Sequence, residues 1–410
     1  MSLSLPFERS MPVQHRWAVW AGPAVVAGAV FFNFGLAFIN AQVMGLSASH
    51  VILAEAGVVG LSHVIILRNY DRLITPWYLL LAFLLIMGAA RWCLIGTVDP
   101  KAVRDVILIP TFFALGIAAG PRAAAPLLLL LQVVTTGVVL FEVIALDLYS
   151  WLFNVKGFYI ATRGLAAEAF WNNESTLFVS ATRPGQRNLF PFLDIHRASS
   201  IFLEPVSLGN YCIIVAAYVS AYARTMARPL LVFYLLTTII LLVACDGRLA
   251  IMVTAVIVGS SLFRPRVPRA SFFFLPVIVL ASFAVDAVVD VRTDDLPGRS
   301  SLAAYVFSRF GLPEWLGMSR AGWAQSADSG ITFLIVNQSI FGALAIWLYI
   351  TLVPAEESRE QAVFKRSALI FLVTTMLISN SYLSIKTAAL LWFLLGTTQR
   401  APEPAGRRRG

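Results

Sequence analysis

Residues 196–210, HRASSIFLEPVSLGN, lie where a long polar interval, residues 147–197, runs into an apolar segment. His196, Arg197 and Glu204 therefore stand at the mouth of an expected membrane helix, where ionisable groups are costly and often functional. Pro205 suits the first turn of that helix, because its missing N–H would have no partner there. The Glu204 carboxylate would then lie at the positive end of the helix dipole.

Two interpretations of this stretch stay open from its residues alone. At a water–lipid boundary, an arginine could bind an anionic lipid-linked substrate and a carboxylate could activate a hydroxyl group. Alternatively, Arg197 and Glu204 could form a structural ion pair that caps the helix.

The composition around this stretch is that of a membrane protein. Hydrophobic residues make up 59% of the chain and charged residues 13%, and the mean hydropathy is +0.78. These values lie outside the range of soluble globular proteins. The net charge of +9 does not indicate nucleic-acid binding, because the basic residues concentrate in short loops between apolar runs. We expect membrane lipid, and no nucleic acid, among the partners.

The alternation of apolar runs and basic clusters predicts an all-α protein, a single transmembrane domain over residues 1–410 with about twelve spans. Both termini are expected in the cytoplasm, with a cytoplasmic tail over residues 399–410. Two large outer loops are expected over residues 147–197 and 290–329. The expected spans are 17–39, 43–67, 76–95, 106–119, 124–146, 205–222, 229–245, 249–263, 271–289, 331–353, 367–379 and 385–397.

Two features of this topology follow from the lengths of the apolar runs. The apolar run 229–263 is interrupted only by Asp246-Gly247-Arg248. As one helix it would be about 50 Å long, too long for a hydrocarbon core of about 30 Å, so a turn is expected there. The closing pair of spans is short, and residues 379–386 could instead form a re-entrant break.

Motifs for bound nucleotides and metals are absent from the sequence. It contains no GxxxxGK[ST] phosphate loop, no GxGxxG after a strand and no HExxH. The four histidines have no metal-ligand spacing, and Asp294-Asp295 in an expected outer loop is a weak candidate metal site. We therefore expect neither a cofactor nor a metal. Any reaction has to use a substrate that is already activated and that is reachable from the outer face.

Arginines are unusually frequent on the expected outer side. Single arginines in long outer loops, such as Arg183 and Arg309, are more simply explained as solvated surface residues. Arg197 and Arg248 differ, because each lies at the end of an apolar span. The planar guanidinium matches phosphate oxygens in a bidentate fashion. A pyrophosphate-linked lipid is the natural ligand for such residues.

Several local patterns together resemble the Wzy-type polysaccharide polymerases, within the wider group that also holds the O-antigen ligases. The first is RASSIFLEP with Gly209-Asn210, over residues 197–210; the second is DGRLA at 246–250. The third runs from GRS at 298–300 to DSGI at 328–331 and on to Phe341-Gly342. YIATRG at 159–164 adds a likeness to polymerases of the xanthan type. The sequence departs from the family pattern at Asp246, where a serine is common, and its second outer loop is compact.

The resemblance implies transfer of a growing glycan from one undecaprenyl pyrophosphate carrier to the end sugar of another repeat unit. The product would be an exopolysaccharide, capsule or O-antigen, made at the outer face of the bacterial inner membrane. Glu204 or His196 would accept the proton of the acceptor hydroxyl; family ligases are thought to use a histidine on that face. The pyrophosphate would be held by four arginines, Arg163, Arg197, Arg248 and Arg299. Flippase and chain-length regulator proteins are the implied partners.

The main alternative is a transporter of lipid-linked sugars or exported polymer. A transporter should carry charged residues near the midplane of several spans and should show two related halves. The ionisable residues of this chain lie largely in outer loops and at span ends. A ligase that uses the same mechanism is the second alternative.

Overall fold

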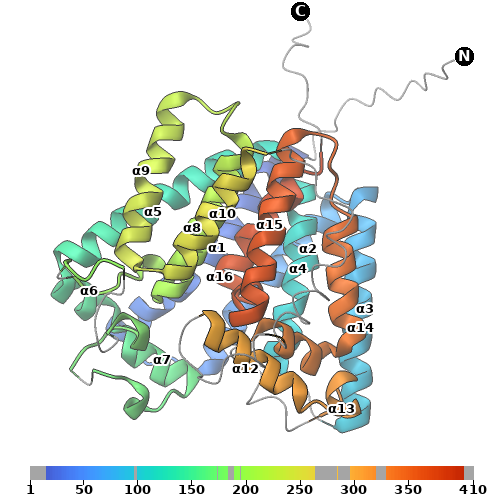
Figure 1. Ribbon diagram of the computed structural model, residues 1–410, viewed down its shortest axis with the longest axis horizontal. Coiled ribbons are helices and arrows are strands. Elements are labelled where there is room, and N and C mark those ends of the chain that lie inside the picture. Colours follow the sequence, from blue (N-terminus) through green and yellow to red (C-terminus); the bar gives the residue numbers. More distant parts are fainter. Residues whose placement is uncertain are drawn as a thin grey trace, which may run out of the picture.

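The computed structural model describes residues 15–96, 99–172, 174–182, 189–193, 195–263, 284, 296–319 and 329–400. In these ranges the regular elements are all helices, and no β-strand occurs. Eight of the described helices are long and apolar enough to cross a membrane. The expected all-α, multi-pass membrane class is thereby confirmed. The long helices stand in a bundle, with shorter ones gathered at its lower end in the view of Figure 1.

The α-helices are α1 (His15–Gln42), α2 (Ala48–Arg68), α3 (Thr75–Ile95), α4 (Pro100–Ala119), α5 (Ala124–Ile144), α6 (Leu146–Phe153), α7 (Val155–Arg163), α8 (Pro205–Tyr222), α9 (Arg228–Cys245), α10 (Arg248–Ser261), α12 (Leu296–Ser308), α13 (Leu312–Trp315), α14 (Gly330–Leu352), α15 (Arg359–Ile378) and α16 (Ile385–Thr397). Among the short 3-10 turns, η5 (Ser200–Phe202) precedes α8 and η7 (Ser381–Leu383) precedes α16.

The break expected in the long apolar run is confirmed at Asp246. This residue ends α9 in the left-handed conformation (φ 48°, ψ 43°), and α10 begins at Arg248. The polar interval 147–197, expected to be a loop, contains the two short helices α6 and α7. The expected span 271–289 lies outside the described residues, as does part of the second polar interval.

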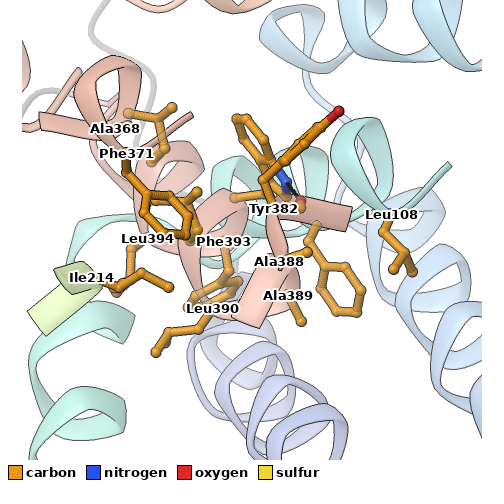
Figure 2. Close-up of a cluster of buried hydrophobic side chains, with 14 of the residues drawn as sticks. Leu108, Ile214, Ala368, Phe371, Tyr382, Ala388, Ala389, Leu390, Phe393 and Leu394 are labelled. Atoms are coloured by element: carbon orange, nitrogen blue, oxygen red, sulfur yellow. Dashed lines mark hydrogen bonds between the residues drawn. The ribbon is translucent and has the colours of Figure 1, made fainter. Parts of the chain in front are cut away.

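The most deeply buried helix is α16, every residue of which is buried. At about 1.5 Å per residue its thirteen residues reach only about 20 Å, less than the hydrocarbon thickness. It packs closely on α4: a Cβ at Gly116 would lie 2.1 Å from the Phe393 carbonyl oxygen, and one at Gly396 2.1 Å from that of Phe113. Figure 2 shows the surrounding apolar cluster, which includes Leu390, Phe393 and Leu394 of α16, Leu108 of α4, Ile214 of α8 and Phe371 of α15.

The two ends of the described chain lie at one end of the bundle. The Arg68 guanidinium lies over the Trp17 ring, 5.7 Å from its centroid. Arg400 at the other end of the chain forms an ion pair with Asp71, with 2.9 Å between Nη2 and Oδ2. We call this the terminal end. At the opposite end, Gln42 closes α1 and donates from Nε2 to the Trp151 carbonyl of α6 at 2.7 Å.

Candidate functional site

The chain enters α8 through a sharp turn at residues 200–205, at the end of the bundle opposite the termini. Ser200 and Leu203 both have positive φ, 53° and 61°, a conformation that costs a residue with a Cβ about 1–3 kcal/mol. Glu204 is the N-cap residue and Pro205 the first residue of α8, as expected. The Glu204 side chain caps no backbone N–H of α8. The simple capping role weighed from the sequence is therefore wrong.

The Glu204 carboxylate instead binds four side chains. Its Oε1 accepts from Tyr159 Oη at 2.7 Å and from Arg163 Nη1 at 3.0 Å. Its Oε2 accepts from Ser207 Oγ at 2.8 Å and from Lys386 Nζ at 3.1 Å. Helices α7, α8 and α16 are thus joined at one carboxylate.

These contacts decide the protonation of Glu204. Burial alone would raise the pKa of this carboxyl group, but the Lys386 ammonium and the Arg163 guanidinium outweigh burial and hold the pKa well below its usual range. The Glu204 carboxyl group is therefore ionised, and both of its oxygens already accept hydrogen bonds or ion pairs. A carboxylate with a lowered pKa is a weak base. The alternative of an ion pair between Glu204 and Arg197 is also wrong, since Lys386 and Arg163 are the cations that contact this carboxylate.

His196 lies beside a second carboxylate, that of Glu142 near the end of α5. The distance from His196 Nε2 to Glu142 Oε1 is 3.1 Å. Glu142 is fully buried, and its oxygens also accept from the backbone N–H groups of Ser199 at 3.0 Å and of Ser200 at 2.6 Å. In the tautomer that donates from Nε2, the carboxylate fixes the orientation of the imidazole ring. This pair has the form of an oriented general base.

The sequence interpretation missed Glu142. Glu142 lies within an apolar run, VVLFEVIA at residues 138–145, which the sequence predicts to be part of a membrane span. Because it is far from His196 in the sequence, their contact could not be predicted. The signal that could have identified it is its own charge, because a lone carboxylate inside a membrane span is a functional candidate by default.

Three of the four predicted arginines have described side chains, and these make different contacts. Arg163 belongs to the Glu204 group, where its side chain is 47% exposed. Arg197 donates from Nε to the Cys245 carbonyl and from Nη1 to the Ser180 carbonyl, both at 3.0 Å, and so holds the end of α9. Arg248 is exposed at the first position of α10, three residues after Cys245. The Arg299 side chain lies outside the described residues, as do Arg183 and Asp294-Asp295.

A third charged group lies next to the Glu204 group. Arg104 of α4 forms ion pairs with Glu55 of α2 and with the adjacent Asp105, and both carboxylates are buried. Glu55 interacts electrostatically with Arg163 and Lys386. The Glu55 carboxylate thus adds negative charge near the two cations that bind Glu204.

The charged residues of these groups lie at similar positions along their helices. Glu55 lies in the second turn of α2, Asp105 in the second turn of α4, and Glu142 in the last turn of α5; Lys386 lies in the first turn of α16. All four helix ends face away from the terminal end. Among the described residues, no group of three or more His, Cys, Asp or Glu side chains is arranged to hold a metal ion.

Comparison with protein-family models, with characterised proteins and with solved structures gives no match to this chain. The function is therefore inferred from the residues and their geometry.

Proposed function

We propose that this protein is a metal-independent membrane glycosyltransferase that polymerises oligosaccharide repeat units linked to undecaprenyl pyrophosphate. The product is an exopolysaccharide, capsule or O-antigen, and the reaction takes place at the outer face of the bacterial inner membrane. The end of the bundle opposite the termini is the outer one in this proposal, with about twelve spans and both termini in the cytoplasm. Flippase and chain-length regulator proteins would supply the substrate and limit the product.

The observation that carries the proposal is the contact between His196 and the buried Glu142. The acceptor sugar hydroxyl gives its proton to the His196 imidazole, and the resulting imidazolium is stabilised by the Glu142 carboxylate. This geometry favours His196 over Glu204 as the proton acceptor, because the pKa of Glu204 is lowered by two cations.

The bond changes then balance without a cofactor. The acceptor oxygen forms a bond to the anomeric carbon of the growing glycan, and the bond from that carbon to the pyrophosphate oxygen breaks. The pyrophosphate leaves with the electron pair, and His196 later releases its proton to water. Arginine is suited to stabilise the leaving charge, and we assign this role to Arg248 and Arg299, with Arg197 and Arg163 as further contacts.

In this proposal Arg197 and Arg163 contact other protein groups as well as the pyrophosphate. Both make protein contacts, Arg197 with two carbonyl groups and Arg163 with Glu204. Arginine has five N–H donors, and the Arg163 side chain is 47% exposed, so N–H groups of Arg163 not used by Glu204 can point to a phosphate.

The placement of the charged groups favours the enzyme over a transporter. The buried carboxylates and Lys386 lie within about two turns of a helix end rather than at mid-span. A ligase that joins finished polymer to another acceptor would use the same chemistry, so the identity of the acceptor has to be measured.

A deletion strain separates the three functions. Loss of a polymerase leaves single repeat units on the lipid in the outer leaflet. Loss of a ligase leaves full-length polymer without its surface attachment, and loss of a transporter leaves lipid-linked units in the inner leaflet. Only the first result supports the proposal, provided that the intact chain restores polymer of normal length.

A further inference from the structure

The short helix α6 has apolar side chains on its exposed face as well as on its buried face. Tyr149 and Phe153 are buried in the protein, whereas Leu148 and Trp151 are 49% and 64% exposed. Asp147, which is also exposed, lies at the edge of this face. A helix with water on its outer side normally carries polar residues there. The exposed face of α6 therefore needs an apolar neighbour.

Two aromatic contacts fix the level of α6 along the bundle. The Phe153 ring stacks on the ring of Phe34 in α1, with 4.1 Å between centroids, and Tyr149 contacts Phe141 of α5 at 6.1 Å. Phe34 lies about two turns, or about 12 Å, before the end of α1 at Gln42. Helix α6 thus packs alongside the last turns of two long helices, and in Figure 1 it lies beside the end of α5.

The exposed face of α6 adjoins the lipid-facing surface of α5. Helix α5 belongs to one of the candidate membrane spans, Pro121–Ile144, and its exposed side chains near this end include Leu140 and Ile144. Only Ala145 separates α5 from α6, and Leu148 follows Ile144 by four residues. Because lipid covers the exposed side chains of a membrane span, the same leaflet reaches Leu148.

Trp151 indicates which layer of the leaflet is in contact with α6. Exposed tryptophans of the described spans lie near the span ends, as do Trp20 in α1 and Trp92 in the last turn of α3. Tryptophan is enriched at membrane–water interfaces, because its ring is apolar and its N–H bonds to water or headgroups. Trp151 has the exposure and the position of such an interface residue.

We propose that α6 is an interfacial helix, which lies in the headgroup layer of the leaflet at the end of the bundle opposite the termini. Lipid covers Leu148 and Trp151, and the exposed Asp147 borders water. The partner of this surface is the phospholipid itself rather than another protein. The inference does not depend on the proposed function.

The buried face of α6 connects the lipid contact with the candidate site. Tyr149 Oη donates to the Ser200 carbonyl at 3.0 Å, and the Ser200 N–H donates to the Glu142 carboxylate at 2.6 Å. The same helix therefore contacts lipid on one face and the turn beside His196 on the other. If the proposed function holds, this arrangement sets His196 at the depth of a lipid-linked pyrophosphate, so the carrier reaches the site without leaving the leaflet.

Nitroxide labels on the full-length chain in phospholipid vesicles test the lipid contact. Single cysteines replace Leu148 or Trp151 in a background with the exposed Cys93 changed to alanine. Collisions of each label are measured with oxygen, which concentrates in lipid, and with a water-soluble nickel chelate present on both sides of the membrane. Val133→Cys, exposed in the middle of α5, is the hydrocarbon reference, and Glu168→Cys, exposed in the polar interval, is the water reference.

We expect Leu148→Cys and Trp151→Cys to give an oxygen-to-nickel collision ratio several-fold above that of Glu168→Cys and below that of Val133→Cys. A ratio equal to that of Glu168→Cys places α6 in water, and one equal to that of Val133→Cys places it in the hydrocarbon core. Few collisions with either reagent show that protein, such as a second copy of the chain, covers this face. Each of these three results overturns the proposal.

Leu148→Cys decides the test if Trp151→Cys does not fold. The vesicles contain no sugar substrate, so the label measurement can succeed or fail independently of polymerisation.

Discussion

At His196, ring nitrogen Nε2 faces the buried Glu142 carboxylate, whereas Glu204 is held between Lys386 and Arg163. The first arrangement orients a base and stabilises its protonated form. The second keeps a carboxylate ionised, because two cations lower its pKa. The two acidic groups therefore have different tasks although both stand beside the segment 196–204.

Replacement of His196 tests the first task. We expect His196→Ala to reduce polymer formation by about a hundredfold or more, the usual contribution of a positioned base. The variant should keep its abundance in the membrane, since the Glu142 carboxylate retains the backbone N–H groups of Ser199 and Ser200 as donors. Glycan length and protein level are measured in the same complemented strain. Normal polymer in His196→Ala cells would remove His196 from the mechanism.

Replacement of Glu204 tests the second task. Glu204→Gln leaves the Lys386 ammonium, 1% exposed, without its carboxylate, and loss of one partner of a buried pair costs about 3–5 kcal/mol. We expect less protein in the membrane and a lower melting temperature in detergent. Arg163→Gln is the matched control, because its side chain is 47% exposed and an exposed pair contributes about 1 kcal/mol or less.

The double variant Glu204→Gln/Lys386→Met should recover much of the loss, because both buried charges are then gone. If Glu204→Gln kept its abundance but lost activity, the structural role would be contradicted, and the result would support Glu204 as the general base.

At the scale of the elements, the sequence predicted the long apolar helices and the break at Asp246, because hydrocarbon thickness limits their length. It could not predict the burial of α16. Hydrophobic periodicity identifies a buried face only when another face is polar, and α16 is apolar on nearly all sides. The contacts of Glu204 with Tyr159 and Lys386 were equally hidden, since they join residues 45 and 182 positions apart (204 − 159 and 386 − 204).

The close contact of α4 with α16 makes a prediction about glycine. Gly116→Ala or Gly396→Ala places a Cβ 2.1 Å from a backbone oxygen of the facing helix, so the helices must separate. We expect strongly reduced levels of folded protein, measured by detergent-solubilised yield and melting temperature. Gly28→Ala in α1 is the control, because nothing lies within 4 Å of its added Cβ and alanine favours a helix. Equal stability of all three variants would show that α4 and α16 do not pack so closely.

At the scale of the whole molecule, the described contacts bring the two chain ends together and set the groups around Glu204, Glu142 and Arg104 at the opposite end. Sequence reasoning, from basic clusters in short loops, expected both chain ends on the same side. It could not state how the crossings pack, because lipid-facing and protein-facing apolar residues look alike in a sequence.

Thiol labelling tests which end is outside. In a background with the exposed Cys93 replaced by alanine, a cysteine at Phe192 or at Tyr70 provides one probe for each end; these residues are 78% and 51% exposed. We expect an impermeant reagent to label Phe192→Cys in cells with a permeable outer membrane, and Tyr70→Cys only after lysis. The reverse pattern would invert the topology and place the candidate site in the cytoplasm.

The most direct test of the central claim is polymerisation by the purified chain. The protein is incubated in lipid vesicles with undecaprenyl-pyrophosphate-linked repeat units, with no nucleotide added, and product length is read from a gel together with released undecaprenyl pyrophosphate. The account predicts a ladder of glycans with one carrier released for each new linkage, and no ladder with His196→Ala. Folded, unaltered protein that leaves every repeat unit single, with no carrier released, would contradict it.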